Sequence, residues 1–355
     1  MRLLIDIGHP GHVHLFRPFA QIMQKKGHEI FFTCREKEFE VELLREAGFK
    51  YKSFGKKYRS LIGKIFGLLK FDLMELSSAL RFKPDIFLSH GSPYAAHVAW
   101  LTRKPHISLE DTGNWEQMRL YLPFTKFVLT PDVLNENLGK KQIRYKGYHE
   151  LAYLHPNHFK PENTGYEILG LREKEPYVIL RFVSWDATHD LGQKGFSFVE
   201  KLEIVNYLKK DYKVFISSEG KLPRDLAVYG LKIHPGQIHE VLANASFCVS
   251  EGATMASEAG VLGTPALYVN SLARTYNEDQ GKFGLVFNFK NGKGVLDKIK
   301  ELCNDNDLKK KTLLSKEKML SEKIDVTAFL VWFIENYPES PQIIKQDPLF
   351  KNRFI

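Results

Sequence analysis

The chain has 355 residues, of which 43% are hydrophobic and 26% charged. This length favours two domains over one, and this composition excludes a disordered or collagen-like protein. The three cysteines, Cys34, Cys248 and Cys303, have no CxxC partner, so neither a disulfide framework nor a zinc site is expected. Lys and Arg (51) outnumber Asp and Glu (42), and the net charge of +9 suits an anionic partner.

The amino-terminal sequence MRLLIDIGHPGHVH has no apolar run of signal-peptide length. No run of 18 uncharged apolar residues occurs elsewhere, so no membrane-spanning helix is expected. We therefore expect a cytoplasmic protein.

The first half of the chain alternates between predicted strands and helices. An apolar run over residues 3–7 is followed by a glycine-containing turn, then by apolar residues at helical spacing from Leu15 to Met23. Further short apolar runs predict strands at 29–34, 86–89, 106–109 and 127–129. This order is typical of a parallel sheet with helices on its faces.

Residues 50–70 contain seven basic residues and no acidic one. Apolar residues within this basic segment recur at helical spacing between Leu61 and Leu69, so a helix here would be basic on one side and apolar on the other. It is either an ordinary helix with a solvated face or a patch for an anionic membrane surface or a lipid acceptor. The membrane alternative would place the protein peripherally at the inner face of the plasma membrane. No aromatic RNA-binding signature or zinc finger accompanies the charge, so no nucleic acid partner is expected.

The second half begins after residues 155–171, which contain two prolines and two glycines without periodicity and suit a linker. Short apolar runs then predict strands at 177–182, 213–217, 231–234, 247–250 and 266–269. A last helix is predicted over 327–337. We expect a second parallel-sheet domain.

Ligands of such sheets bind at the loops after the strands, where helix N-termini point. The first such loop, residues 8–14, contains Gly11, which permits close backbone approach, and His12 and His14, which can take up a proton near neutral pH. Alternatively, these histidines cap the following helix. No suitably spaced acid or thiol ligands accompany them, so no metal is expected.

Two other loops of the first half carry polar side chains. His90 and Gly91 form a turn that is weak evidence on its own. Glu110 and Asp111 follow the next strand, where they could orient a substrate or act as acid and base. They could equally belong to a solvated loop or cap a helix.

A polar loop follows the first strand of the second half. Arg181 and Lys194 could supply positive charge to a phosphate, with His189 between them. An ordinary surface loop is the alternative.

The most specific sequence runs from Ser250 to Pro265, where a strand leads through small residues into a helix. Gly252, Ala253 and Thr254 would let a diphosphate approach the helix N-terminus. Glu258, one turn further, could accept hydrogen bonds from a vicinal diol such as ribose. The alternative is an acid that merely complements the helix dipole.

With these motifs the chain resembles the GT-B superfamily of nucleotide-sugar enzymes, and in particular the domain of unknown function 354 family. More distantly it is similar to the lipid-linked N-acetylglucosaminyltransferase of peptidoglycan synthesis and to UDP-N-acetylglucosamine 2-epimerases. Residues 251–265 and 8–14 carry this resemblance. It implies an α/β protein of the GT-B fold, with two Rossmann-like, doubly wound parallel-sheet domains facing a central cleft. The expected boundaries are 1–160 for the acceptor side, 161–325 for the donor side, and 326–355 for a helix and tail that pack toward the N-terminal domain.

The resemblance also implies roles for individual residues. Glu258 matches the ribose-binding glutamate, and residues 252–254 match the loop beside the diphosphate. His12 matches the position beside the acceptor. Looser matches are His234, flanking a uracil pocket, and the region of Asn277 and Glu278, which reads the donor sugar. The side chains in this last region depart from the family's polar pattern, so the sugar is left open.

The implied activity is transfer of a sugar from a nucleotide-diphosphate sugar to a glycan or lipid-linked acceptor, in the synthesis of surface polysaccharide or glycoconjugates. No DxD motif lies in the loops that follow the predicted strands, so metal independence is expected, with no cofactor. His12 is the leading base, and Glu110 or Asp111 is the substitute. The competing hypotheses are a sugar-nucleotide 2-epimerase and a nucleotide-binding partner without catalysis.

Overall fold

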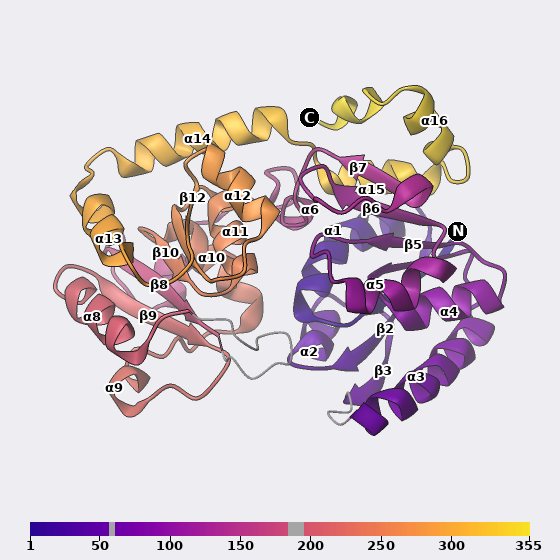
Figure 1. Ribbon diagram of the computed structural model, residues 1–355, viewed down its shortest axis with the longest axis horizontal. Coiled ribbons are helices and arrows are strands. Elements are labelled where there is room, and N and C mark those ends of the chain that lie inside the picture. The colour runs from indigo at the N-terminus through magenta and orange to yellow at the C-terminus, as the bar shows by residue number, and fades with distance from the viewer. Residues whose placement is uncertain (57–60, 184–194) are drawn as a thin grey trace. The chain divides into compact units, whose positions relative to one another are not determined.

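The computed structural model describes residues 1–56, 61–183 and 195–355 and divides the chain into two compact units (Figure 1). The N-terminal unit comprises residues 1–153 and 324–355, and the C-terminal unit comprises residues 154–323. The chain therefore passes between the units twice, after Tyr153 and after Lys323.

The N-terminal unit is built on a parallel sheet of seven strands in the order β3-β2-β1-β4-β5-β6-β7. The order reverses between β1 and β4, so the loops after these two strands flank the switch point where such sheets bind ligands. The strands are β1 (Arg2–Ile7), β2 (Glu29–Glu36), β3 (Tyr51–Lys56), β4 (Ile86–His90), β5 (His106–Leu109), β6 (Phe127–Pro131) and β7 (Gln142–Tyr145).

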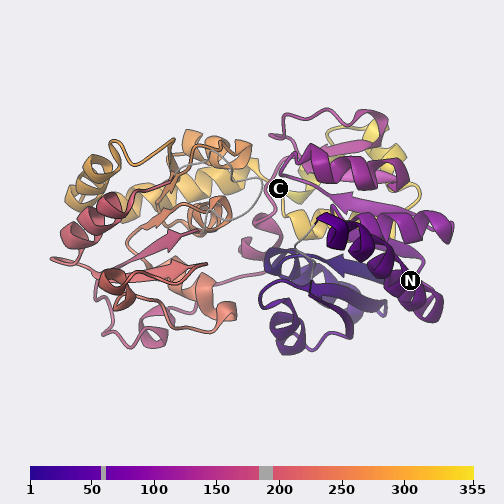
Figure 2. The same ribbon diagram turned by 60° about the horizontal axis from the view of Figure 1, so that its bottom comes forward.

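The helices of the N-terminal unit include two from the far end of the sequence. Figure 2 shows these yellow helices in the same unit as the indigo strands. Helix α15 buries Phe329 and Phe333, and its Glu335 accepts hydrogen bonds at 2.6 Å from Lys26 and at 3.2 Å from His28. The helices are α1 (Pro10–Lys25), α2 (Glu40–Glu46), α3 (Leu61–Phe82), α4 (Pro93–Leu101), α5 (Trp115–Tyr121), α6 (Leu151–Leu154, at the boundary), α15 (Val326–Glu335) and α16 (Ser340–Gln346).

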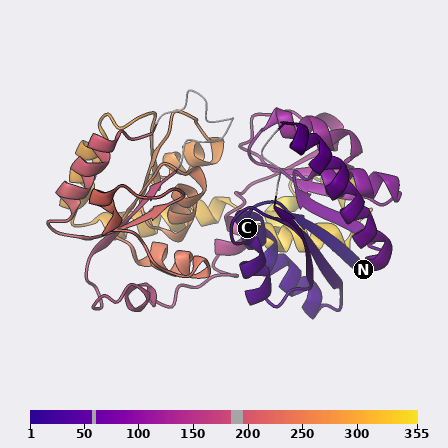
Figure 3. The same ribbon diagram turned by 90° about the horizontal axis from the view of Figure 1, so that it is seen from below.

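The C-terminal unit contains a parallel sheet of five strands in the order β12-β11-β10-β8-β9. Figure 3 shows its helices on both sides of the sheet. Its order reverses between β8 and β10, and the loops after these strands flank the second switch point. The strands are β8 (Tyr177–Phe182), β9 (Lys213–Ser218), β10 (Cys248–Ser250), β11 (Ala266–Val269) and β12 (Val286–Phe289). The helices are α7 (Gly165–Ile168), α8 (Phe198–Leu208), α9 (Arg224–Ala227), α10 (Ile238–Asn244), α11 (Ala253–Leu262), α12 (Thr275–Lys282), α13 (Val295–Asn304) and α14 (Leu308–Glu322).

The prediction of two doubly wound parallel-sheet domains is confirmed. The strand predicted at 231–234 is wrong: the residue before this segment, Gly230, forms one isolated bridge with Ile216, and a 3-10 helix begins after the segment at Pro235. Three strands, β3, β7 and β12, were not predicted. All three lie at sheet edges and mix polar with apolar residues, so they lack the apolar run that identifies a buried strand.

The segment predicted as a linker, residues 155–171, is ordered against the C-terminal unit. It contains α7, where a Cβ on Gly165 would lie 2.7 Å from the carbonyl oxygen of Glu240 on α10. Only glycine permits this close approach. The predicted domain boundary at residue 160 therefore lies inside the C-terminal unit.

The basic segment, residues 50–70, contains β3 and the start of α3, and its residues 57–60 lie outside the described part of the chain. Among the described helices, none combines the length and the apolar character needed to cross a bilayer.

Candidate functional site

Four polar side chains meet at the carboxyl edge of the N-terminal sheet. His12 lies in the first turn of α1, His90 ends β4, Asp111 follows β5, and His149 follows β7. Asp111 bridges two of the rings: its Oδ1 lies 3.0 Å from Nε2 of His90, and its Oδ2 lies 3.1 Å from Nδ1 of His149. The ring of His12 lies against that of His90, with 4.5 Å between their centroids. The structure thus brings the predicted residues His12 and Asp111 into one cluster, linked by His90.

The charges in this cluster follow from these contacts. Burial alone would lower the pKa of His90, but the hydrogen bond and charge of Asp111 raise it to about 9. Burial opposes ionisation of Asp111, but the charges and hydrogen bonds of His149 and His90 hold the pKa of its carboxyl well below its ordinary value. At neutral pH His90 is therefore a cation and Asp111 an anion. Asp111 is poorly suited to the predicted role of base, because it does not take up a proton near neutral pH.

Glu110 organises the loop after β5. Its Oε1 accepts hydrogen bonds from the backbone N–H (2.8 Å) and the hydroxyl (2.7 Å) of Thr112 and from the N–H of Gly113 (3.2 Å). Its Oε2 accepts from the hydroxyl of Tyr121 at 2.7 Å. The carboxylate is buried, and acting as a base would weaken these four bonds.

The histidines of the first loop hydrogen-bond to its backbone. His9 caps α1, since its Nδ1 accepts from the N–H of Gly11 at 3.1 Å. The Nδ1 of His12 accepts from the N–H of Gly8 at 3.2 Å. A ring nitrogen that accepts such a bond carries no proton, so the proton of a neutral His12 is on Nε2. The half-buried ring of His14 lies beside that of Tyr153, with 5.6 Å between centroids.

Within the described residues, one group of three side chains could hold a metal ion: His90, Asp111 and His149, whose ligand atoms lie within 4.8 Å of one another. Two imidazoles and one carboxylate form a donor set that zinc accepts. Here the carboxylate instead accepts a hydrogen bond from each ring.

In the C-terminal unit the N-terminus of α11 has no side-chain cap. Its N-cap is Gly252, whose own N–H donates to the Ser250 hydroxyl at 3.0 Å. Ala253 is half-buried and Thr254 is exposed, and the first N–H groups of a helix have no partner within the helix. Asn277 of α12 donates to the carbonyl of Ala253 at 3.3 Å, while its buried Oδ1 has no hydrogen-bond partner among the described residues.

The carboxylate of Glu258 is paired with a histidine that was not predicted as a site residue. Its Oε1 lies 3.0 Å from Nε2 of His239 on α10. His234 begins the turn before α10, and its Nδ1 accepts from the N–H of Gly236 at 3.2 Å. This contact therefore links residues 234–239 to α11. Both of these segments were predicted to bind the donor. Both pair residues lay in the motif segments, but sequence spacing does not show that α10 and α11 pack together.

A second buried acid, Glu251, holds both ends of the loop after β8. It accepts hydrogen bonds from the N–H groups of Val183 (3.0 Å) and Phe196 (2.8 Å) and from the amine of Lys201 (3.1 Å). The predicted ligands His189 and Lys194 belong to residues 184–194, outside the described part of the chain.

Two other residues predicted to bind the donor, Arg181 and Glu278, lie in an ion pair and at the surface, respectively. Arg181 donates to Ser217 at 2.9 Å and to Glu219 at 2.7 Å, so its charge is partly compensated. Glu278 is exposed on α12, whereas its neighbour Asn277 is buried.

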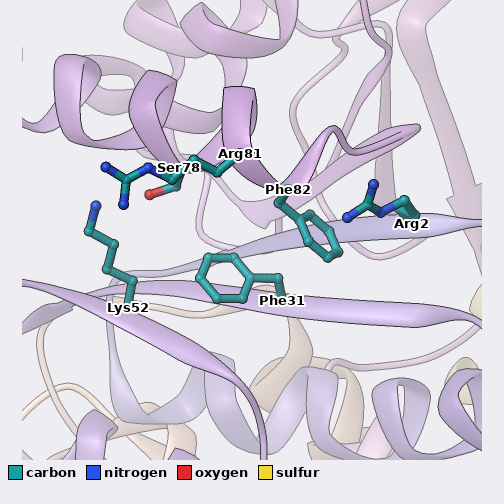
Figure 4. Close-up of a pocket in the computed structure, with 6 residues that line it drawn as sticks. All are labelled: Arg2, Phe31, Lys52, Ser78, Arg81 and Phe82. Atoms are coloured by element: carbon teal, nitrogen blue, oxygen red, sulfur yellow. The ribbon is translucent and has the colours of Figure 1, made fainter.

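Two hollows lie away from these strand ends. A cavity of about 260 Å³ is near the amino ends of the first strands, where Figure 4 shows Lys52 and Arg81 facing one another beside Ser78. Its other lining residues are Arg2, Phe31 and Phe82. A groove of about 310 Å³ is lined mainly by apolar residues of α3 and α4.

Comparison with known proteins gives a family and a fold. A sequence profile described as "Protein of unknown function (DUF354)" matches residues 1–323. The uncharacterised protein MJ0665 of Methanocaldococcus jannaschii is 24% identical over 279 residues, which cover 74% of this chain and 80% of that protein.

Several solved structures share the fold at low identity. The MnaA–UDP co-structure from S. aureus has a TM-score of 0.67 at 14% identity and covers 96% of this chain and 97% of that one. The UDP-GlcNAc 2-epimerase of M. jannaschii, in complex with UDP-GlcNAc and UDP, has a TM-score of 0.64 at 14% identity (86% and 94%). The glycosyltransferase SsfS6 of Streptomyces sp. SF2575 has 0.57 at 15% identity (95% and 100%). The fold is therefore that of the GT-B superfamily.

The pair of His90 and Asp111 makes stability depend on pH. Because the folded pKa of His90, about 9, lies above its ordinary value of 6.5, the pair stabilises the fold fully below pH 6.5 and loses this contribution as pH rises through 9. Replacing His90 by Gln should reduce the free energy of unfolding by about 3 kcal/mol more at pH 6 than at pH 10, measured by urea denaturation. Asp111→Asn and the double variant complete a mutant cycle. A destabilisation that does not change with pH would contradict the assignment.

Proposed function

Since this chain belongs to the DUF354 family, we propose its function from its own residues and from the fold that it shares with sugar-nucleotide enzymes. The proposal is that it transfers a sugar from a nucleoside-diphosphate sugar to a glycan or lipid-linked acceptor, in the synthesis of surface polysaccharide or glycoconjugates. The C-terminal unit binds the donor and the N-terminal unit the acceptor.

The observation that carries the donor assignment is the uncapped N-terminus of α11. Its N–H groups and the positive end of its dipole suit a diphosphate, as at other helix N-termini of this fold class. The unpartnered Oδ1 of Asn277 beside Ala253 can accept a hydrogen bond from a ligand hydroxyl. Glu258, oriented by His239, can accept hydrogen bonds from a ribose. Among the structural neighbours, two contain UDP and a third is bound to UDP-GlcNAc, which supports a uridine nucleotide, although another contains thymidine diphosphate.

The acceptor side favours a transferase over an epimerase. Removing a carbon-bound proton from the sugar requires a strong, available base. Neither carboxylate after β5 is well suited to be this base. Glu110 already accepts four hydrogen bonds, and Asp111 already pairs with two histidines. A cluster of this kind is better suited to holding a second substrate. Neither a cofactor nor a metal has a role in the proposal: the amides of α11, together with Arg181, would stabilise the departing diphosphate.

Turnover with a nucleotide-sugar panel tests the proposal. The purified protein should release nucleoside diphosphate only when an acceptor fraction is added, and it should form an acceptor-linked product by mass spectrometry. An epimerase would instead incorporate deuterium at the sugar C2 without any acceptor. Nucleotide binding with neither reaction would favour a non-catalytic partner. EDTA should leave turnover unchanged, and loss of activity on chelation would contradict metal independence.

Replacing Glu258 by Ala should weaken UDP binding. The variant loses hydrogen bonds to a charged acceptor, each worth about 1.5–3 kcal/mol, so affinity should fall at least about 10-fold by calorimetry. Asp297→Ala, at an acid whose side chain is 82% exposed in the same unit, is the matched control and should bind UDP normally. Thermal unfolding of both variants checks their folding. Unchanged UDP affinity in folded Glu258→Ala would contradict the ribose assignment.

We also propose that the N-terminal unit binds an anionic membrane through α3 and α4. Helix α3 buries Phe71 and Ala79 on one face, yet its other face carries exposed Phe66, Leu69 and Leu73. With Trp100, Leu101 and Phe124, these helices form the apolar groove described above. A helix that is apolar on both faces suits a second apolar environment. Exposed cations on α3 (Lys70 and Arg81) and directly after α4 (Arg103 and Lys104) favour an anionic bilayer.

Acidic substitutions in this groove should release the protein from vesicles. Leu73 and Trp100 are 67% and 63% exposed, so Leu73→Glu and Trp100→Glu should fold normally but bind phosphatidylglycerol vesicles several-fold more weakly by sedimentation. The matched control is Val228→Glu, at an 81% exposed valine of the C-terminal unit. Equal binding of all three variants, or equal binding of wild type to neutral vesicles, would contradict the membrane proposal.

A further inference from the structure

The cavity at the amino ends of the first strands, called here the amino-edge cavity, lies away from the candidate site. Its lining comes from the amino-terminal halves of three strands, with Arg2 on β1, Phe31 on β2 and Lys52 on β3, and from the last two turns of α3. These strands are parallel, so their amino ends lie at the opposite edge of the sheet from His90 and Asp111. A ligand in this cavity would therefore not compete with one at the carboxyl edge.

Two cations face one another across the amino-edge cavity. Figure 4 shows the amine of Lys52 and the guanidinium of Arg81 pointing toward each other from β3 and α3. In the part of the chain that the structure describes, neither of these side chains forms an ion pair with an acid. The Nζ of Lys52 instead lies 5.9 Å from the centroid of the Phe54 ring. Like charges that face one another repel, and an anion between them would replace this repulsion by two attractions.

The acids near the cavity lie beside its third cation, Arg2. The Nε of Arg2 is 3.7 Å from Oε1 of Glu29, and its backbone N–H donates to Asp85 at 2.8 Å. Among the described residues that line the cavity there are three cations and no acid. The carboxyl end of α3 contributes a partial charge of only about −0.5. The positive charge of Lys52 and Arg81 is therefore left uncompensated.

The rest of the lining is mainly apolar. The rings of Phe31 and Phe82 are half-buried, with 5.4 Å between their centroids. The hydroxyl of Ser78 donates to the carbonyl of Met74 at 2.8 Å, so the cations and not this hydroxyl would supply the donors to a ligand. The volume of about 260 Å³ is below the range of about 300–1,000 Å³ that is usual for drug-sized ligands. This size suits a small ligand and not a whole nucleotide sugar.

We propose that the amino-edge cavity binds a small phosphate ester, with its phosphate group between Lys52 and Arg81 and its organic group against Phe31 and Phe82. A phosphate monoester carries a charge of about −1.5 to −2 at neutral pH, which matches two cations, whereas a carboxylate matches one. The planar guanidinium can donate two parallel hydrogen bonds to phosphate oxygens, and the amine adds a point charge. This site is separate from the proposed donor and acceptor sites, and it does not rest on the proposed transferase function.

The test uses phenyl phosphate as the probe in calorimetry, with the full-length protein saturated with UDP so that the proposed donor site is filled. An ionic strength of about 0.15 M screens exposed charges beyond about 8 Å. Phenyl phosphate should bind several-fold more tightly than inorganic phosphate, which lacks the ring. It should also bind several-fold more tightly than benzoate, which has the ring but a single charge. Equal affinity for phenyl phosphate and benzoate would contradict a phosphate site.

Substitutions of the two cations locate the site. Lys52→Gln should weaken phenyl phosphate binding about 10-fold, because it removes a half-buried charged donor. Arg81→Gln should weaken binding about fivefold, because this side chain is exposed and its attraction is partly screened. Arg81→Lys keeps the charge and should retain affinity within about threefold. A purely structural role of Arg81 would not distinguish these two variants in this way.

The matched control is Arg45→Gln. Arg45 is exposed in the last turn of α2, as Arg81 is in the last turn of α3 of the same unit. This variant loses the same charge and should bind phenyl phosphate like wild type. Thermal unfolding checks that all variants fold. Unchanged affinity in folded Lys52→Gln and Arg81→Gln, or an equal loss in Arg45→Gln, would overturn the inference.

The position of the anion and the source of the ester can also be tested. In crystals soaked with tungstate, anomalous density should lie between Lys52 and Arg81, and an empty cavity beside density elsewhere would overturn the inference. If the natural ester is a lipid headgroup, phosphatidic acid vesicles should displace phenyl phosphate and phosphatidylcholine vesicles should not. If neither vesicle displaces it, the ligand is a soluble ester. Both of these results leave the site in place.

The outcomes separate this inference from the proposed function. If UDP does not bind but the substitutions of Lys52 and Arg81 weaken phenyl phosphate binding, the cavity site stands and the donor assignment falls. If UDP binds but phenyl phosphate does not, the donor assignment stands and the cavity site is wrong.

Discussion

The shared direction of all strands in each sheet determines where this protein can do chemistry. In a parallel sheet every strand ends at the same edge, so residues far apart in sequence, such as His12, His90, Asp111 and His149, arrive together. The strand order reverses between β1 and β4 and again between β8 and β10. His12 follows β1, and His90 is the last residue of β4. Glu251 and Gly252 follow β10, and the loop that Glu251 holds follows β8.

The two units use the same strand-loop-helix element in different ways. In the N-terminal unit the helix after the first strand is capped by its own His9, and its loop presents histidine rings. In the C-terminal unit the helix after β10 begins at Gly252, which provides no side-chain cap. A capped helix end is a weaker anion site than an uncapped one, because a donor that is already bonded must exchange partners. In the proposed function, this difference favours phosphate binding by the backbone of α11 and recognition by side chains in the first loop.

Much of the architecture could be predicted from sequence, because buried parallel strands are continuous apolar runs. The edge strands β3, β7 and β12 were not predicted, because they mix polar with apolar residues and contain no such run. Since β7 was not predicted, His149, which follows it, was not recognised either. Residue type identified Asp111 and Glu258 as candidates, but their partners His90 and His239 depend on packing between segments that are distant in sequence. The role of base for His12 stays a prediction; the structure adds a hydrogen bond from the backbone N–H of Gly8 to its Nδ1, whose direction no spacing rule gives.

Burial of an ion pair alone does not indicate a functional site, as a second pair in the N-terminal unit shows. Asp6 of β1 bonds to Arg35 of β2 inside the protein, beside the fully buried Glu75 of α3. Burial and the charge of Asp6 raise the pKa of Glu75 well above its ordinary value, so they favour the neutral form of this acid. That cluster is sealed, and its polar groups specify packing. The pair of His90 and Asp111 has similar chemistry, but the switch point places it at the sheet edge, where its charge can act on a ligand.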